Sequence, residues 1–386
     1  MSALSVAIVR ARYNPFGGAE RYTQRAMAAL GAAGVHVTVI ARRWPMGPVE
    51  DLPVRLTLLK VDPFHLGSLW RDWSFARGVR RVLRGHRFDL VQSHERVAGV
   101  SLYRAGDGVH ASYLEQRRRV LPAWRAALLA LDPHHRWVLR EERAMFTDPA
   151  LRAVVCNASS VLEDIHRRFG VPRERLHLLR NGLDLDRFAP PTPAQRAQAR
   201  RALGLADEVP VFAFVGSGFE RKGLAASLQA LHAAPGQSVL LVAGTDRRLA
   251  RYRRQARALG IESRVHFLGG IDDVRPVLWA ADGFLAPALY DPFPNAALEA
   301  LACGLPLIAS PTCGVSELIE PGVNGFIHDA LDVAALAGSI ACLIARRADD
   351  AMRRAARASA MPWSLEAAAH ALLMLYRQVL AESPAP

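Results

Sequence analysis

The sequence predicts an α/β protein made of two doubly wound domains, each with a parallel sheet. A β-branched run at residues 4–9 leads into a glycine-containing loop, a helical pattern and a second strand-like run at residues 35–41. This is the order of a β-α-β unit. The same order starts again at residues 209–216. Because each half of the chain opens on such a unit, we expect two Rossmann-like domains.

A turn-rich stretch at residues 172–190 separates the two halves. We therefore expect an N-terminal domain over residues 1–175 and a C-terminal domain over residues 176–361. The cleft between their strand ends is the expected ligand site, as in other open α/β sheets. Residues 362–386 form a last helix with no strand after it, which could pack against either domain.

The composition is that of a globular protein with an excess of arginine. Of the 386 residues, 51% are hydrophobic, which is enough for two full cores. The net charge of +13 comes from 49 basic residues spread along the chain, of which only Lys60 and Lys222 are lysines. Since no nucleic-acid-binding motif accompanies them, an anionic lipid surface or a phosphorylated substrate is favoured over nucleic acid.

Neither the cysteines nor the hydrophobic runs indicate a secreted or membrane-spanning protein. The four cysteines form no C-x-x-C pair and have no histidine at zinc spacing, so we expect a reducing compartment and no metal centre. No apolar run has the length of a membrane span. Arg10 and Arg12 follow the first strand too soon for a signal peptide. We expect a cytoplasmic protein.

The segment YDPFPNAALEALACGLPLIAS, residues 290–310, places two acids around a helix start. Proline suits the first turn and a Gly-Leu-Pro stop follows, so a helix is expected from about Pro294 to Cys303. Asp291 then lies before the helix and Glu299 on its second turn. Because free N–H groups at a helix start bind anions, the acids suggest a phosphate with hydroxyl-rich neighbours. They could equally be a dipole-stabilising acid and a solvent-facing glutamate.

A second candidate site is GSGFERKG, residues 216–223, after the first strand of the second half. It is not a Walker A loop, because Lys222 is followed by Gly223 and not by Ser or Thr. Arg221 and Lys222 nevertheless stand together at the C-terminal edge of a strand, where they could bind a diphosphate. A solvated charge pair is the alternative, although cations oppose the helix dipole there.

Two further motifs have ordinary explanations as well. Gly17-Gly18 could let the backbone approach a phosphate or a sugar, but a plain tight turn explains it more simply. It is not G-x-G-x-x-G, and the stretch after the second strand is basic, so a nicotinamide dehydrogenase is disfavoured. Asp184 and Asp186 could hold a divalent metal, but such aspartates more often cap a turn or a helix.

Taken together, the motifs resemble the retaining GT-B glycosyltransferases of family 4 over nearly the whole chain. The resemblance rests on PFGGAER, RNGLD, FVGSGFERKG, VHFLGG, residues 290–310, CGVSELIEPGVNGF and a closing helix at Trp363. It implies two facing Rossmann-like domains, a nucleoside diphosphate sugar held mainly by the C-terminal domain, and an acceptor on the N-terminal domain. It also implies no metal or cofactor, and a final helix that crosses back to the first domain.

The resemblance implies roles for single residues. Asp291 resembles the carboxylate that orients donor-sugar hydroxyls, and Glu299 the one that accepts both ribose hydroxyls. Arg221 and Lys222 resemble the cations that neutralise the leaving diphosphate. Backbone amides at the helix start resemble contacts to the sugar and diphosphate; these belong to Phe293, Asn295 and Ala296.

Two positions of the first half are also implied in donor binding. Gly17 and Gly18 resemble the loop that closes on the phosphates and the acceptor. His94, at the end of FDLVQSHE, is similar to a histidine near C6 of the donor sugar, with an ordinary interdomain histidine as the alternative.

Three departures from the family pattern leave the sugar specificity open. Asp291 stands where most members have Glu, Ser217 where many have Arg, and Pro294-Asn295 where a glycine-aliphatic pair is usual. The leading expectation is transfer of glucose from UDP-glucose to a lipopolysaccharide-core or other surface-glycan acceptor. Alternatives are a GDP-sugar donor, a non-catalytic nucleotide-sugar-binding protein, and a glycoside hydrolase using the two acids, which leaves the basic and glycine loops unexplained.

Residues 112–143 suggest where the protein works. They carry seven arginines against four acids, with Tyr113, Trp124 and Trp137 and an apolar AALLAL between the charges. This pattern fits a segment on an anionic bilayer, and it resembles the membrane-docking region of the lipopolysaccharide-core members. We expect a peripheral protein on the inner face of the plasma membrane. The alternative is that the apolar residues pack into the first domain while the arginines stay solvated.

Overall fold

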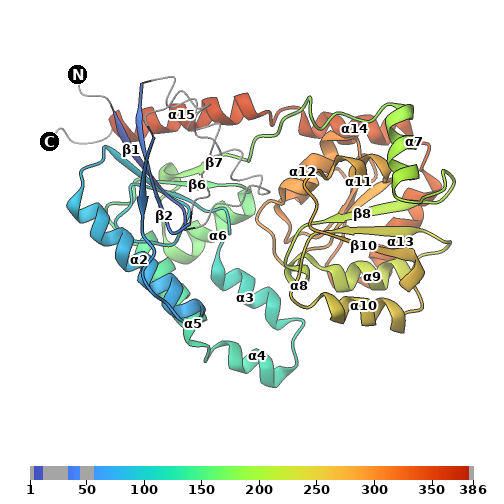
Figure 1. Ribbon diagram of the computed structural model, residues 1–386, viewed down its shortest axis with the longest axis horizontal. Coiled ribbons are helices and arrows are strands. Elements are labelled where there is room, and N and C mark those ends of the chain that lie inside the picture. Colours follow the sequence, from blue (N-terminus) through green and yellow to red (C-terminus); the bar gives the residue numbers. More distant parts are fainter. Residues whose placement is uncertain (1–3, 12–33, 44–55, 382–386) are drawn as a thin grey trace. The chain divides into compact units, whose positions relative to one another are not determined.

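The computed structural model describes residues 4–11, 34–43 and 56–381, and the chain divides into two compact units (Figure 1). Unit 1 comprises Met1–Gly182 and Leu365–Pro386, and unit 2 comprises Leu183–Ser364. The chain therefore passes from one unit to the other twice.

The first division lies after Gly182, later than the expected one after residue 175. Strand β7 (Leu176–Leu178) is the reason, because it pairs with β6 (Ala153–Cys156) at the edge of the first sheet. Asn181 also accepts a 2.6 Å hydrogen bond from the buried Arg104. The second division lies after Ser364, against an expected 361.

Unit 1 is built on a parallel sheet with the strand order β3-β2-β1-β4-β5-β6-β7. Its strands before β6 are β1 (Ser5–Val9), β2 (His36–Ala41), β3 (Leu56–Lys60), β4 (Leu90–Ser93) and β5 (Leu102–Arg104). The central strands β1 and β2 are apolar and almost wholly buried, as expected when a parallel sheet is covered on both faces.

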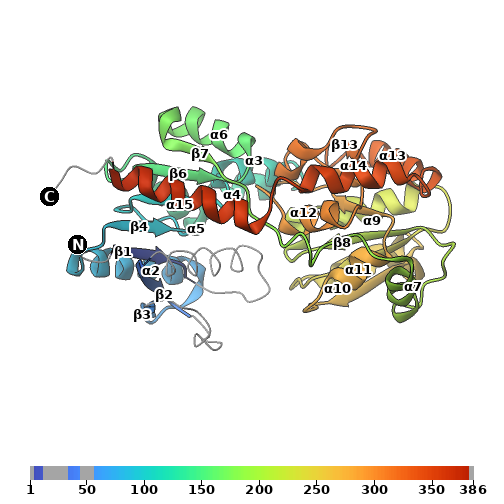
Figure 2. The same cartoon turned by 90° about the horizontal axis from the view of Figure 1, so that it is seen from above.

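The helices of unit 1 include the last helix of the chain. They are α2 (Gly67–Gly85), α3 (His110–Arg118), α4 (Ala123–Leu129), α5 (Pro133–Phe146), α6 (Ser159–Phe169), α15 (Leu365–Ala381) and the short η2 (Arg173–Arg175). Helix α15 lies along unit 1 (Figure 2) and contributes Leu372, Leu375 and Tyr376 to the core of the first sheet. The Tyr376 hydroxyl donates a 2.6 Å hydrogen bond to Gln92 on β4.

Unit 2 has a parallel sheet in the order β10-β9-β8-β11-β12-β13. Its strands are β8 (Val211–Val215), β9 (Val239–Ala243), β10 (Val265–Gly269), β11 (Gly283–Ala286), β12 (Leu307–Ala309) and β13 (Gly325–Ile327). Numbered from the first strand of the unit, this is the Rossmann order 3-2-1-4-5-6, and unit 1 has the same order with one strand more. Both predicted doubly wound domains are present.

The helices of unit 2 cover its sheet and continue its core. They are α7 (Pro193–Ala202), α8 (Phe219–Lys222), α9 (Leu224–Ala233), α10 (Leu249–Ala258), α11 (Arg275–Ala280), α12 (Asn295–Ala302), α13 (Val333–Ala345), α14 (Asp350–Ala360), η3 (Glu262–Arg264) and η4 (Gly314–Leu318). The bounds of α12 confirm the helix expected from about Pro294 to Cys303, which are its two cap residues. None of the described helices combines the length and apolarity needed to span a bilayer.

Candidate active site

The switch point of the unit 2 sheet brings the two main sequence candidates together. Strands β8 and β11 are neighbours, but the chain runs from β8 towards β9 on one side and from β11 towards β12 on the other. Lys222 follows β8, and Asp291 follows β11. Ligands of doubly wound sheets bind beyond the carboxyl ends of the strands at such a point.

Lys222 and Asp291 form a partly buried ion pair at this edge. The Lys222 Nζ donates a 2.7 Å hydrogen bond to Asp291 Oδ2, and an Arg221 nitrogen lies 3.6 Å from the same oxygen. Asp291 is only 5% exposed. Burial alone would raise its pKa, but Lys222, Arg221 and the N–H of Phe293 hold the pKa below its ordinary value. The Asp291 carboxylate is therefore ionised at neutral pH and aimed at the cations.

Glycines shape the path of the chain on both sides of Lys222. Gly216 has φ +138°, and a Cβ there would lie 2.4 Å from the Lys222 Cε. Gly223 has φ +81°, and a Cβ there would lie 1.8 Å from the carbonyl oxygen of Pro287. Only glycine allows this close approach. The glycines of the motif thus let Lys222 and the loop pack closely against the strand edge. In a Walker A loop the glycines instead let the backbone N–H groups surround a phosphate.

The N-terminus of α12 opens beside Asp291. Pro294 is its N-cap, and its ring offers no side-chain acceptor for the first N–H groups. Asn295 and Ala296 are partly exposed, whereas Phe293 and Glu299 are buried at 4% and 7% exposure. An anion can approach this half of the helix, and the helix dipole favours it there. Glu299 is not the solvent-facing glutamate of the alternative interpretation.

Sequence reasoning missed two residues, Thr245 and Asp246, that hold the loop after β8. Asp246 accepts a 2.8 Å hydrogen bond from the backbone N–H of Phe219, at the start of α8. The Ser217 hydroxyl accepts a 3.1 Å hydrogen bond from the N–H of Thr245. The signal was the polar Gly-Thr-Asp that directly follows the strand at residues 239–243.

His94 occupies the corresponding switch point of unit 1, because it directly follows β4, the neighbour of β1. Burial, with Arg10 and Arg104 near by, lowers the pKa of His94 well below its ordinary value, so the ring is neutral at pH 7. Its Nε2 lies 2.9 Å from the Gln92 amide nitrogen, which therefore donates to it. The other predicted residues of this unit, Gly17 and Gly18, lie outside the described residues.

Asp184, the last residue of the RNGLD stretch, behaves as a turn residue. Asp184 accepts a 3.0 Å hydrogen bond from the N–H of Arg187, which is the capping role set against the metal interpretation in the sequence. Across the described parts of the chain, no three His, Cys, Asp or Glu side chains gather as metal ligands.

Comparison with known families assigns both units. The model described as Glycosyltransferase Family 4 matches residues 16–187, and that described as Glycosyl transferases group 1 matches residues 195–360. The chain belongs to the family 4 glycosyltransferases, and its two Rossmann-type units are those of the GT-B fold.

Individual relatives agree with this assignment. The lipopolysaccharide glucosyltransferase WaaG of Escherichia coli K12 is 28% identical over 327 residues, or 83% of this chain and 84% of WaaG. A crystal structure of WaaG, described as involved in lipopolysaccharide biosynthesis, superposes with a TM-score of 0.83 at 25% identity, covering 96% and 99% of the two chains. The D-inositol 3-phosphate glycosyltransferase of Mycobacterium marinum is 30% identical over 89% of this chain and 73% of its own.

Proposed function

We propose that the chain transfers a hexose from a nucleoside diphosphate sugar with retention of anomeric configuration, and that glucose from UDP-glucose is its donor. The observation that carries the proposal is the Lys222–Asp291 pair beside the open N-terminus of α12, at the switch point of unit 2. The likeness to a lipopolysaccharide glucosyltransferase supports glucose and a lipopolysaccharide-core or other surface-glycan acceptor.

The proposed chemistry is charge stabilisation. As the bond between C1 and the diphosphate breaks, negative charge collects on the phosphate oxygens and positive charge on the sugar ring. Lys222 has three N–H groups, of which Asp291 takes one, so two remain for the diphosphate. Arg221 and the first N–H groups of α12 add to this, and fixed donors of this kind act without reorganisation.

The two acids take separate parts in this proposal. Asp291 is held by Lys222 at the strand edge, where its second oxygen can accept hydroxyls of the donor sugar. Glu299, on the next turn of α12, accepts the ribose hydroxyls of the nucleotide. The acceptor attacks on the face from which the diphosphate leaves, so no enzyme nucleophile is part of the mechanism, and the proposal assigns the diphosphate charge to Lys222 and Arg221 with no metal or other cofactor.

The acceptor side of the proposal includes docking on the inner face of the plasma membrane through residues 112–143. These residues form α3, α4 and most of α5, where Trp124, Leu128 and Leu131 are 61%, 52% and 66% exposed. The Arg125 guanidinium lies 4.8 Å from the centre of the Trp124 ring. The exposed apolar side chains on α4 support the membrane interpretation, since packing into unit 1 would have buried them.

Three measurements test the proposal. Thermal-shift titrations with UDP-, GDP- and ADP-glucose identify the donor base, and we expect the largest shift with UDP-glucose. Turnover of labelled UDP-glucose then separates an enzyme from a non-catalytic nucleotide-sugar-binding protein, which would bind the donor without releasing UDP. The anomeric configuration of the product by NMR tests retention. A larger thermal shift with GDP-glucose would mean that the donor is a GDP-sugar and not UDP-glucose. An inverted product would exclude the proposed mechanism.

A further inference from the structure

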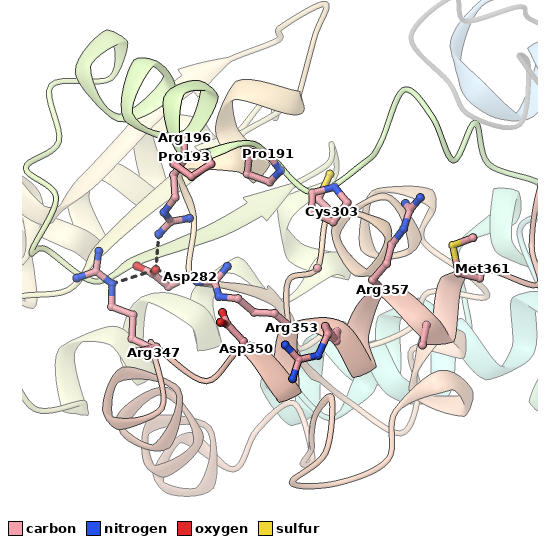
Figure 3. Close-up of a pocket in the computed structure, with 15 residues that line it drawn as sticks. Pro191, Pro193, Arg196, Asp282, Cys303, Arg347, Asp350, Arg353, Arg357 and Met361 are labelled. Carbon is pink, nitrogen blue, oxygen red and sulfur yellow. Dashed lines mark hydrogen bonds and ion pairs between the residues drawn. The ribbon is translucent and has the colours of Figure 1, made fainter.

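A second pocket of unit 2 lies at the opposite edge of the same sheet from Lys222 and Asp291. It has a volume of about 870 Å³ and is formed by the start of α7, the residues before β11 and after α12, and helix α14 (Figure 3). Asp282, on its wall, directly precedes β11 and so marks the amino ends of the strands. The pocket is therefore not part of the site at the strand carboxyl ends, and nothing in the proposed transfer uses it.

The wall of this pocket carries an excess of positive charge. Five arginines and only two aspartates line it; these are Arg196, Arg347, Arg353, Arg354, Arg357, Asp282 and Asp350. Arg200, buried behind them, also donates to Asp282. A concave surface lined mainly by one sign of charge concentrates counter-ions of the opposite sign.

The Asp282 carboxylate is approached by more hydrogen-bond donors than it has lone-pair sites. Its Oδ2 accepts from Arg200 and from the N–H of Val211, each at 2.9 Å. Its Oδ1 receives Arg196 at 2.5 Å, Arg347 at 3.0 Å and Arg353 at 3.3 Å. Because a carboxylate offers about four lone-pair sites, the longest of these five contacts, that of Arg353, is not needed to satisfy Asp282.

Two adjacent arginines of α14 are consequently available to a ligand. Arg353 makes one hydrogen bond, the 3.3 Å contact to Asp282, and the structure records no partner for the exposed Arg354 in the described part of the chain. Burial, reinforced by the like charge of Arg196, lowers the pKa of Arg353. A negatively charged ligand would offset both effects by its attraction to the guanidinium.

Arg357 has a different use from its neighbours. Its N–H groups donate to the carbonyl oxygens of Leu185, Phe188 and Ala302 at 2.8 to 3.0 Å. Arg357 thereby links α14 to residues 185–188, which follow the first division of the chain. Arg357 is therefore structural and not one of the proposed ligand-binding arginines.

The side of the pocket across from α14 presents proline rings beside Arg196. In Figure 3, Pro191 and Pro193 lie opposite Arg353 and Arg357, and Met361 closes one end. Proline rings and a methionine give a ligand a surface for an apolar or ring-shaped body, while the arginines take its charge. The volume is within the range of small-molecule sites, roughly 300 to 1,000 Å³.

We propose that this pocket is a second anion site, separate from the donor site, which binds a phosphate ester or diphosphate through Arg353 and Arg354 while the body of the ligand rests on the prolines. Arginine suits this chemistry because its planar N–H groups match the oxygens of a phosphate. The proposal does not depend on the identity of the sugar donor.

The test is calorimetric titration of the full chain with inorganic pyrophosphate and without UDP, because the diphosphate of UDP would compete for the pocket. The variant Arg353→Gln/Arg354→Gln should lose at least tenfold in affinity. Arg354→Gln alone should lose part of the affinity, and it breaks no recorded contact, so its folding is not in question. The matched control is Arg253→Gln/Arg254→Gln on α10, a pair of exposed arginines of which Arg253 has one ring contact. It should bind as the wild type does.

Lys222→Ala separates this site from the donor site, because it weakens only the donor site and should keep the pyrophosphate binding that depends on α14. Loss of binding in Lys222→Ala, with none in the α14 variants, would assign all binding to the donor site and overturn the proposal. Equal losses of pyrophosphate affinity in the α10 and α14 pairs would show nonspecific attraction by a basic surface. That result would also overturn the proposal.

The source of the phosphate is distinguished by two further probes. Glucose 1-phosphate represents a soluble ester, and vesicles containing phosphatidic acid represent a lipid headgroup. The probe that binds the wild type should bind Arg353→Gln/Arg354→Gln more weakly and the α10 control equally well. If neither probe nor pyrophosphate binds in an α14-dependent way, the pocket is not a phosphate site.

Discussion

Asp291 would be costly to bury without Lys222, since a carboxylate at 5% exposure loses most of its hydration. The 2.7 Å contact compensates for this, and it also fixes the carboxylate at the edge where two strands diverge. One ion pair thus serves both the fold and the proposed chemistry. A variant at either residue has to be checked for stability before its activity is interpreted.

Lys222→Ala should reduce kcat for sugar transfer by at least roughly 100-fold, or ~3 kcal/mol, because the leaving diphosphate loses a fixed cation where negative charge develops. Steady-state release of UDP from UDP-glucose measures this. Lys60→Ala, which changes the other lysine of the chain at an exposed position, should remain close to wild type. Similar activity of the two variants, with both folded by circular dichroism, would remove Lys222 from the mechanism.

Glu299→Ala should weaken nucleotide binding by about 2 kcal/mol, or roughly 30-fold in Kd for UDP, because hydrogen bonds to a charged group are worth about 1.5 to 3 kcal/mol. These bonds are the same in the ground state and the transition state, so kcat at saturating donor should change little. Calorimetry with UDP measures the first effect and saturation kinetics the second. The exposed Glu262→Ala is the control; UDP binding equal to wild type in Glu299→Ala would show that Glu299 does not bind the ribose.

At the level of residues, the sequence located the charged groups of the candidate site but not those that support it. Lys222 and Asp291 could be placed because each follows an apolar run, and parallel strands present their carboxyl ends at one edge. Asp246 and Thr245 could not, because their role depends on β9 lying next to β8. Which strands lie side by side depends on the strand order of the sheet, and a local sequence pattern does not predict that order.

Among the elements, the loop from β8 to α9 sets the most demanding backbone conditions. Gly223→Ala should lower the free energy of unfolding of unit 2 by more than Gly218→Ala does. Both glycines have positive φ, at +81° and +77°, so both variants carry the cost of ~1 to 2 kcal/mol of a left-handed residue. Only at Gly223 would the new Cβ meet a backbone atom, the carbonyl oxygen of Pro287 at 1.8 Å; at Gly218 the space is open.

Urea denaturation of the two glycine variants, followed by circular dichroism, makes this comparison. The backbone cost is common to both, so the difference between their midpoints reports the clash alone. Equal midpoints would mean that the β8–α9 loop shifts freely away from Pro287, and the loop would then be too soft to position Lys222 as proposed.

The elements themselves followed from local signals where these were strong. Helix α12 agrees with its prediction to within one residue at each end, because proline and glycine mark its two ends. The observed domain boundary differs from the predicted one, because β7 is a three-residue strand that is recognisable only by its pairing with β6. Short edge strands depend on distant partners, whereas helix ends depend on their own residues.

At the scale of the whole molecule, the two Rossmann-type units follow from the repeated β-α-β order, and the last helix belongs to unit 1 by its contacts with the first sheet. The pattern of the helix alone left its partner open, because an amphipathic helix specifies an apolar face without specifying what covers it, and only the family resemblance predicted its return to the first domain. Tyr376 and Gln92, which make the contact, are 284 residues apart.

The surface of unit 1 should bind anionic bilayers through α3 and α4. Vesicle sedimentation should show binding that rises with the fraction of anionic lipid and falls with salt, because each arginine near such a surface contributes ~1 kcal/mol and is screened by ions. Arg118→Gln/Arg119→Gln should weaken it by an order of magnitude or more, and Trp124→Ser should weaken it even at low salt, because the 61% exposed indole would no longer enter the headgroup layer. Arg253→Gln/Arg254→Gln on α10, which removes the same charge from unit 2, should leave binding unchanged. If that control loses as much as the α3 variant, or if binding is insensitive to salt, the attraction is not specific to residues 112–143 and the membrane assignment is wrong.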